Sequence, residues 1–475
     1  MTTSSFSVTD RIRGNTVRSL YQFFTAPKKW KMHRERTNQM KAVFCPKPWN
    51  HVGTLTNGSY RACCNILLGD WGVLTDEDGS LLNAKHNGMD AAINAPLNRE
   101  LRQSMLRGER NPRCLPCWQR EDAGLESARE ILNKEFPHML PQVSQADVGD
   151  AAHLDSSQFP IENLDLRLGN KCNLKCKICS PTESSSWIND WAELKRANSE
   201  TKIDYYGQEV RIAQDGLNWR FADESTFNWY KDSALLNDVI ARAKDLKQIY
   251  FTGGEPFINR PHWQLLQALK DSGFAQQIRL HYNTNLTVLP SEAESVWSNF
   301  HSVQISCSLD GVGAYAEYLR PPSNWDVIVK NVMRLDQSPS FIKVSWSPTV
   351  SLLNIAHLPE MSLWILRQGF KKTGPIMWFN ILGNPIYFSC QTLSMKSKLE
   401  VQNRYQKTFQ TIENEFGILV ADNLRTHFQP LLKYMFAEDH SKYLKSFHKH
   451  TEALDRIQGK NLEKYLPDVA QLIRM

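Results

Sequence analysis

From about residue 162 on, short apolar runs typical of strands alternate with stretches whose apolar residues have the spacing of helices. Short apolar or β-branched runs predict strands at residues 162–168, 247–252, 277–283, 302–309, 342–350 and 376–382. Stretches with apolar residues at helical spacing lie between them and predict helices at residues 235–246, 262–273, 324–335 and 358–369. This alternation predicts six parallel βα units, and hence an α/β fold that closes partway toward a (β/α)6 barrel.

The rest of the chain divides by composition. Five of its ten cysteines precede a stretch rich in Pro, Ser, Asp and Ala, which has the composition of a linker. Residues 190–230 read as an insertion after the first βα unit. In chain order we predict a polar helical segment (1–40), a small hairpin-plus-helix domain (41–135), a linker (136–160), the βα core (161–390) and a C-terminal helical extension (391–475).

The totals are those of an ordinary globular protein, with 41% apolar and 22% charged residues among 475. The N-terminus lacks the apolar stretch of a secretory signal, and no run approaches the roughly 18 apolar residues of a membrane span. We therefore expect a cytoplasmic protein without a membrane partner, in which clustered thiols favour metal over disulfides. The net charge of +6 is modest, and the basic stretch at 27–36 is better explained as a solvated helix face than as a nucleic-acid site.

Three cysteines, Cys172, Cys176 and Cys179, lie within eight residues directly after the first predicted strand of the core. Gly169 and Asn170 before them permit the tight turns that a loop needs to wrap around a cluster. Three thiolates on a four-iron, four-sulfur cluster leave one iron open to another ligand. A structural zinc site would need a fourth Cys or His, and within twenty residues on either side the chain offers only a histidine at 153.

This loop resembles that of the radical S-adenosylmethionine (SAM) enzymes, whose Cys-x3-Cys-x2-Cys motif follows the first strand of a partial (β/α)6 barrel. The residue before the third cysteine is usually aromatic in that family and is Ile178 here. Further motifs lie at successive strand ends in the family's order, the first being "TGGEP" at 252–256. The resemblance implies SAM contacts at Gly253, Gly254, Glu255, Pro256, Asn283, Asn285, Ser308, Asp310 and Arg320.

What the resemblance implies is a reaction. A cluster on the three cysteines chelates the amino and carboxylate groups of SAM, and one electron cleaves SAM to a 5′-deoxyadenosyl radical that abstracts hydrogen from a substrate. Glu255 has the chemistry to accept from the SAM ammonium, and Arg320 has the fork that clamps a carboxylate. The expected reductant is an external donor such as flavodoxin or ferredoxin.

The second cysteine group is Cys45, Cys63, Cys64, Cys114 and Cys117. Asn57-Gly58 lies between two alternating runs and predicts a type I′ hairpin that carries Cys63 back toward Val52. "RCLPC" then supplies a Cys-x2-Cys knuckle, so that hairpin and knuckle together offer four ligands for a second cluster. Adjacent residues on a strand point to opposite faces, which favours Cys63 over Cys64 as the ligand.

This second pattern resembles the twitch domain, the shortened auxiliary-cluster domain of radical SAM enzymes, although that domain usually follows the barrel. A four-cysteine zinc site is the alternative. The resemblance leaves the substrate open between a peptide or protein and a small molecule, and favours the former by analogy. The competing classes are a non-enzymatic iron–sulfur electron-transfer protein and a two-zinc scaffold.

Four further residues are not assigned a role in the reaction. Cys307 and Cys390 are expected to be small core residues, with radical quenching as the alternative. Trp378 and Tyr387, near the sixth predicted strand, are candidates for lining a substrate pocket.

Overall fold

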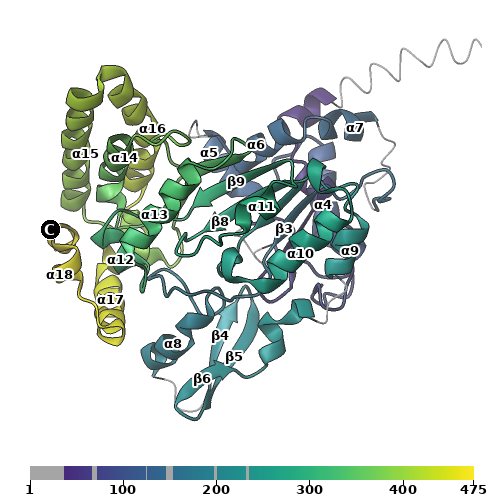
Figure 1. Cartoon of the computed structure of the whole chain (residues 1–475), viewed down its shortest axis with the longest axis horizontal. Helices are drawn as coiled ribbons and strands as arrows, with labels where there is room; N and C mark the ends of the chain where they lie inside the picture. The colour runs from purple at the N-terminus through teal and green to yellow at the C-terminus, as the bar shows by residue number, and fades with distance from the viewer. Residues whose placement is uncertain are drawn as a thin grey trace, which may run out of the picture.

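The computed structural model describes residues 37–66, 72–122, 124, 126–145, 153–196, 200–231 and 235–474. A seven-stranded sheet runs through its centre (Figure 1), with strands in the order β10-β9-β8-β7-β3-β1-β2. All neighbours are parallel except β1 and β2. The strands are β1 (His51–Thr54), β2 (Tyr60–Arg61), β3 (Asn163–Leu166), β7 (Gln248–Phe251), β8 (Arg279–Thr284), β9 (Ser302–Cys307) and β10 (Ile342–Trp346).

The N-terminal cysteine-bearing segment is part of this sheet, which corrects the predicted division of the chain. β1 pairs in parallel with β3, so that Val52 lies beside Leu164. Apolar side chains of residues 40–143, Trp49 among them, share one buried cluster with the βα core. Within the predicted linker, Met139–Gln145 form helix α7, and residues 146–152 lie outside the described residues. Segment 41–135 is therefore not packed as a separate domain.

The hairpin exists, but its turn differs from the predicted type I′. The amide of Gly58 donates to the carbonyl of Leu55, and Gly58 has a φ of +83°. This is a three-residue loop, in which a type I turn is followed by a left-handed glycine. The extra loop residue moves the register by one, so that Gly53 pairs with Arg61 and Thr54 with Tyr60.

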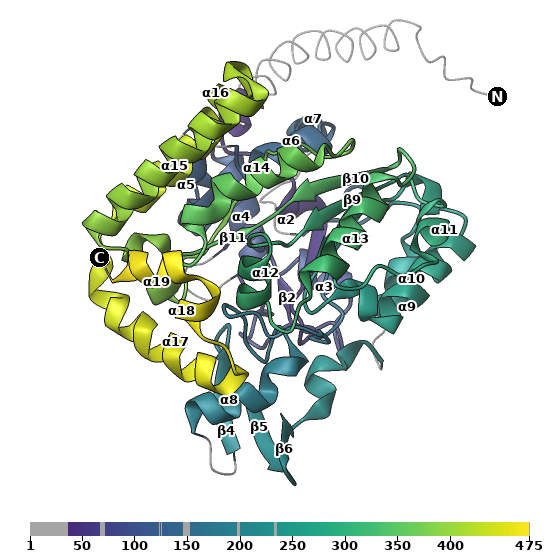
Figure 2. The ribbon, with the colours of Figure 1, turned by 60° about the vertical axis from the view of Figure 1, so that its left-hand side comes forward.

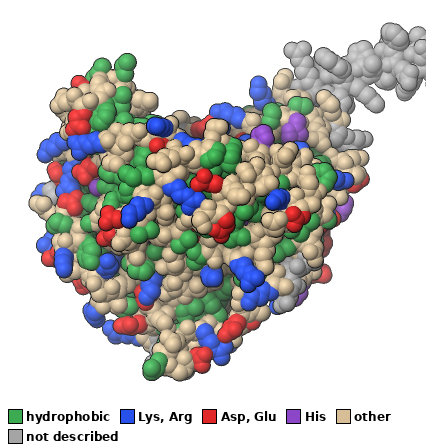
Figure 3. Space-filling model, viewed as in Figure 1, with side chains coloured by type: hydrophobic (Ala, Val, Ile, Leu, Met, Phe, Trp, Pro, Cys, Tyr) green, Lys and Arg blue, Asp and Glu red, His purple; other side chains and the backbone are tan. Residues whose placement is uncertain are grey.

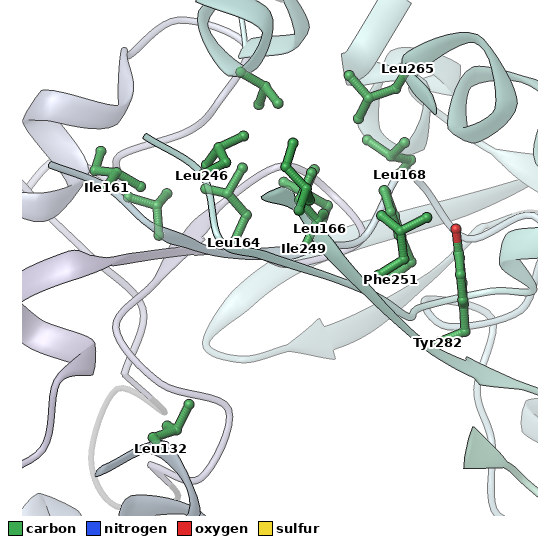
Figure 4. Close-up of a cluster of buried hydrophobic side chains, with 14 of the residues drawn as sticks. Leu132, Ile161, Leu164, Leu166, Leu168, Leu246, Ile249, Phe251, Leu265 and Tyr282 are labelled. Atoms are coloured by element: carbon green, nitrogen blue, oxygen red, sulfur yellow. The ribbon is translucent and has the colours of Figure 1, made fainter. Parts of the chain in front are cut away.

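One face of the central sheet is apolar and buried. Leu164, Leu166, Ile249 and Phe251 lie on the same side of the strands (Figure 4) and pack against helices that include α10. The four helices predicted between strands of the core are present as α9 (Leu235–Ala241), α10 (Arg260–Asp271), α13 (Trp325–Asp336) and α14 (Leu358–Gln368). Their apolar faces close this side of the fold.

The sixth predicted strand is reduced to a short bridge. β12 (Asn380–Ile381) pairs in parallel with β11 (Thr349–Val350), which continues the chain beyond β10. The predicted insertion is a small antiparallel sheet that projects from the core beside helix α8 (Figure 1). Its elements are α8 (Ile188–Lys195), β4 (Glu200–Tyr205), β5 (Gln208–Asp215) and β6 (Asn218–Phe221).

The C-terminal extension is helical, as predicted, and packs on the barrel. Its helices are α15 (Met395–Phe416), α16 (Ile418–Ala437), α17 (Leu444–Gln458), α18 (Leu462–Tyr465) and α19 (Pro467–Ile473). They form a second apolar cluster with α12 (Ala314–Leu319) and α14. Figure 2 shows α17 along the flank of the molecule, next to α8.

Most of the predicted N-terminal helix, including the basic stretch at 27–36, lies outside the described residues. Among the described residues, no helix is both long and apolar enough to cross a membrane. Acidic and basic side chains are interspersed on the face that Figure 3 shows, so the described part of this face lacks the extended basic surface that phosphate backbones bind.

Candidate functional site

The three-cysteine loop begins six residues after the end of β3, at the carboxyl end of the parallel strands. In α/β barrels this end carries the reactive groups, because the loops that follow the strands converge there. The loop is fastened on both sides of Cys176: the Lys175 amide donates to the carbonyl of Pro321, and the Lys177 amide to that of Leu319. Cys172, Cys176 and Cys179 are free thiols that are each partly exposed.

The C-terminal helices hold this loop. The Lys177 ammonium is buried, donates to Oδ1 of Asp455 on α17, and lies 4.4 Å from the centre of the Tyr318 ring. The side-chain amide of Gln458 donates to the Lys175 carbonyl at 3.3 Å. Ile178, where the family usually has an aromatic residue, packs against the apolar cluster of the C-terminal helices. An apolar contact is thus kept at this position without the ring.

The "TGGEP" segment follows β7 and leaves room for the same loop. A Cβ atom on Gly254 would lie 2.4 Å from the Lys171 carbonyl oxygen, and Gly254 has a φ of +52°. Only glycine allows this approach without displacing the backbone that leads into Cys172. Pro256 begins the short 3-10 turn after the glycines.

Glu255 is buried and its carboxylate accepts three hydrogen bonds from the protein. The donors are the amides of Phe257 and Asn285 and the hydroxyl of Thr284, at 3.1, 2.8 and 2.7 Å. Burial raises the pKa of Glu255 to about 7. In this structure the side chain joins β7 to the end of β8, and acceptance from a SAM ammonium stays a prediction.

Two of the predicted SAM contacts lie against the cysteine thiols. Asn285 Nδ2 is 4.0 Å from the sulfur of Cys172, and Arg320 Nη1 is 3.9 Å from that of Cys176. The guanidinium of Arg320 also forms a two-bonded pair with Asp310, at 2.8 and 2.9 Å. The guanidinium of Arg320 therefore binds Asp310 in this structure and is not free to bind the carboxylate of a ligand in the same way. Asn283 and Ser308 lie nearby, at the ends of β8 and β9, and are partly exposed.

The donor set fits a thiolate-bound cluster. Burial raises the pKa of Cys176 to about 12 and also raises that of Cys172, so both thiols keep their protons until a metal displaces them. The Asn285 and Arg320 donors would then offset thiolate charge, as hydrogen bonds to cluster sulfurs do. Among the described residues, no three Cys, His, Asp or Glu side chains converge closely enough to hold a single metal ion. A tetrahedral zinc ion would need thiolates about 2.3 Å from the metal.

The second cysteine group gathers beside β1 and β2. The side-chain amide of Asn65 donates to the sulfur of Cys117 at 3.8 Å, and the Asn65 backbone amide donates to that of Cys63 at 3.4 Å. Burial raises the pKa of Cys114 to about 12, with Cys45 and Cys117 as further causes, which places these three thiols together. The end of the hairpin and the knuckle thus lie close together, and their binding of a second cluster stays a prediction.

The structure does not support the reason for favouring Cys63 over Cys64 as a ligand, which was that adjacent residues on a strand point to opposite faces. β2 ends at Arg61, so the two cysteines lie in the turn beyond it and their side chains are not forced to opposite faces. The two thiols interact with each other. Cys64 is the one next to the buried Lys47 ammonium, 4.0 Å away. Lys47 is therefore a cation at the second group that the sequence did not single out.

A family model matches the part of the chain that contains the first site. Residues 166–338 match the radical SAM superfamily model. This part of the chain is similar to a radical SAM domain. The match begins inside β3 and ends after α13, so this domain includes the three-cysteine loop and the "TGGEP" segment. The domain makes the chain an enzyme, of unassigned substrate. None of the curated proteins compared matches the chain.

Two solved structures are similar to part of the chain. One is native anSMEcpe with bound AdoMet, at 12% sequence identity and a TM-score of 0.33 over 56% of this chain. The other is native anSMEcpe with bound AdoMet and Cp18Cys peptide, at 12% identity and a TM-score of 0.34 over 53% of this chain. The similarity spans 62% and 61% of those chains, which is less than two thirds of their length.

The structure shows the surroundings of the two cysteines and two aromatic residues that have no assigned role in the reaction. Cys307 and Cys390 are fully buried in the two apolar clusters, as expected of small core residues. Trp378 lies under the guanidinium of Arg120 on α5 (Leu115–Asp122), the helix that also bears Cys117, at 4.9 Å. Tyr387 contacts His450 of α17 at 3.4 Å. Both aromatic residues thus join segments around the barrel.

A cavity of about 920 Å³ lies at the other end of the strands. Its lining includes Lys247, Arg279 and His301, which sit where β7, β8 and β9 begin. In folds of this kind the amino ends of the strands serve stability and the carboxyl ends carry reactive groups. This cavity is therefore not the reaction site.

Proposed function

We propose that this chain is a radical SAM enzyme that binds a four-iron, four-sulfur cluster through Cys172, Cys176 and Cys179 and reductively cleaves SAM there. The resulting 5′-deoxyadenosyl radical abstracts hydrogen from a substrate, which we propose to be a peptide or protein, with a small molecule as the alternative. The observation that carries the proposal is the family match over residues 166–338, which contains the three cysteines at the carboxyl end of β3.

When bound, the cluster supplies one electron to SAM. The chain's own residues perform the remaining tasks. Asn285 and Arg320 direct N–H groups at two of the cysteine sulfurs, which favours the more negative, reduced state. The Lys177–Asp455 pair holds the loop under the C-terminal helices, which limits the access of water. Gly254 lets the backbone of the "TGGEP" segment approach the cysteine loop.

We propose a second, twitch-like cluster at the auxiliary group, with Cys45, Cys63, Cys114 and Cys117 as ligands and Cys64 as the reserve for Cys63. A fully ligated cluster has no open iron, so its role would be to relay an electron between the substrate and the barrel cluster. The position of the group beside β1 supports a relay, because β1 and β3 are hydrogen-bonded neighbours. We place the reaction in the cytoplasm, with flavodoxin or ferredoxin as reductant.

The test is anaerobic electron paramagnetic resonance of the dithionite-reduced, iron-reconstituted protein with and without SAM. SAM should change the spectrum of the wild type, because it binds the open iron. Cys176→Ala should lose this response, whereas Cys390→Ala, which removes a buried thiol of the second apolar cluster, should keep it. A SAM response in Cys176→Ala equal to that of the wild type would contradict the proposal.

A further inference from the structure

The inner face of the central sheet, opposite the apolar face, is polar and ranges from buried to partly exposed. Across neighbouring strands, Asp165, Tyr250, His281 and Gln304 stand side by side in one register row. Tyr250, His281 and Gln304 are each partly exposed, while the residues between them along the strands are fully buried. The exposed part of this row therefore consists of polar side chains.

Asp165 and Arg167 on this face have unmet hydrogen-bonding capacity. Asp165 is 5% exposed, and among the described residues its Oδ1 has no hydrogen-bond partner. The same holds for Nε of Arg167, which lies 3.8 Å from that oxygen, too far for a hydrogen bond. A buried acceptor and a buried donor left in this state are costly, and native proteins keep few of them.

The other charged groups of the site are already hydrogen-bonded by the protein, so the Asp165–Arg167 pair is the one left to bind a ligand. Glu255, Asp310 and Arg320, the charged residues that the family pattern pointed to, are all satisfied by protein partners. Gly253 makes space for the pair, because a Cβ atom there would lie 2.9 Å from the Cβ of Arg167. Arg167 stands five residues before Cys172, so the pair lies on the strand that leads to the cysteine loop.

A strained turn of the insertion lies beside the Asp165–Arg167 pair. Tyr206, in the two-residue turn between β4 and β5, has a φ of +53°, which is uncommon for a bulky residue. Its ring lies 5.1 Å from the guanidinium of Arg61, at the end of β2. The adjacent Tyr205 hydroxyl donates to Glu183 Oε1, whose other oxygen is 4.0 Å from Arg167. The turn thus closes over the side of the pair that faces the insertion.

We propose that Asp165 and Arg167 form the substrate subsite and bind an α-amino carboxylate unit, supplied by a free amino acid or by the C-terminal residue of a peptide. The guanidinium fork of Arg167 takes the carboxylate in a two-bonded geometry, and Asp165 accepts from the ammonium or amide N–H. A ligand that carries both groups satisfies both orphaned atoms at once. This subsite deepens the proposed function and rests on it for the identity of the reaction.

Saturation-transfer NMR on the cluster-loaded, oxidised protein tests the subsite with two probes, glycine and N-acetylglycine, in the presence of saturating SAM. The wild type should give a signal with at least one probe. Glycine alone indicates a free amino acid, and N-acetylglycine indicates a peptide terminus. Asp165→Leu/Arg167→Met should weaken binding at least about tenfold. A probe signal that appears only in a parallel sample without SAM would assign the pair to the cofactor, and a wild type that is silent in both samples or an undiminished variant would overturn the subsite.

Thermal unfolding separates this role from a structural one. A pair kept for a ligand stabilises the free protein little, so the double variant should melt at or above the wild-type temperature. Arg242→Met is the matched control, because Arg242 is a partly buried arginine with two ion-pair partners, Asp238 and Asp90. Arg242→Met should melt lower. A double variant that melts below this control would show that the pair holds the fold, and would overturn the proposal.

Cleavage of SAM by the wild type, measured in parallel, keeps the two proposals apart. Probe binding without any cleavage would refute the proposed function and leave the subsite standing. Cleavage without probe binding would refute the subsite alone.

Discussion

Replacing Asp455 with alanine removes the carboxylate through which the C-terminal helices hold the cysteine loop. Its two oxygens accept from the Lys177 ammonium, from the Tyr318 hydroxyl at 3.0 and 3.1 Å, and from the Leu462 amide at 2.8 Å. Lys177 is 2% exposed, so in the variant its charge stays buried with only the face of Tyr318 beside it.

The expected loss of stability follows from this burial. Breaking a buried ion pair by removing one partner costs about 3–5 kcal/mol, because the remaining charge is left without compensation. With an unfolding entropy of about 2.1 cal/mol/K per residue, a chain of 475 residues that melts as one unit shifts by about 1 °C per kcal/mol. The Asp455→Ala melting temperature should therefore fall by about 3–5 °C.

The assay measures two quantities, the thermal unfolding of the reconstituted protein and the iron retained after desalting in air. Because Lys177 lies between Cys176 and Cys179, loss of its anchor should also speed the loss of iron. Asp468→Ala is the control, since Asp468 lies in the same helical extension, is 43% exposed, pairs with Arg404 and accepts from the Tyr315 hydroxyl, so that its loss should cost about 1–2 kcal/mol. Lys177→Met/Asp455→Leu, which removes both charges, should recover most of the lost stability.

The reasoning is refuted if Asp455→Ala melts and loses iron as the wild type does. It is also refuted if Asp468→Ala loses iron as fast as Asp455→Ala, because the effect would then belong to the helical extension as a whole.

Three further predictions follow from single contacts. Gly254→Ala should reduce SAM-dependent 5′-deoxyadenosine formation at least about tenfold with an unchanged circular dichroism spectrum, because its Cβ would meet the Lys171 carbonyl; normal formation would contradict the close approach. Cys114→Ala should lower the iron content while the reduced barrel cluster still responds to SAM; unchanged iron would remove the second cluster. The pKa of Glu255, raised by burial from 4.5 to about 7, means that the folded state holds a proton that the unfolded state releases. Stability should therefore fall as the pH rises from about 4.5 to 7. Glu255→Gln should lose this fall in urea titrations, and an equal pH slope in both proteins would show that another group is responsible.

The sequence predicted what depends on local pattern. Strands and helices of the core were found because their apolar residues repeat at 2 and 3.6 positions, and the two cysteine groups because thiols are rare in this chain. The parallel pairing of β1 with β3 joins residues more than a hundred positions apart, so no local pattern could indicate it. The hairpin register differed by one residue because Asn57-Gly58 suits both a two-residue and a three-residue loop.

The inner-face pair was missed for another reason. In "LDLRL" Asp165 and Arg167 alternate with leucines, in the first strand predicted for the core. Charges at alternate positions of such a strand indicate a polar inner face, and this signal was available. What the sequence could not show is that Glu255, Asp310 and Arg320 would be hydrogen-bonded by the protein while Asp165 Oδ1 and Arg167 Nε would not, because that depends on side-chain packing.

Quantifying 5′-deoxyadenosine tests the central claim most directly. The protein is reconstituted anaerobically with iron and sulfide, reduced with dithionite and incubated with SAM, beside Cys176→Ala and the Cys390→Ala control. The account predicts the nucleoside from the wild type and from Cys390→Ala, and none above background from Cys176→Ala. Equal amounts from the wild type and Cys176→Ala would contradict it, because SAM would then be cleaved without the cluster that Cys172, Cys176 and Cys179 are proposed to hold.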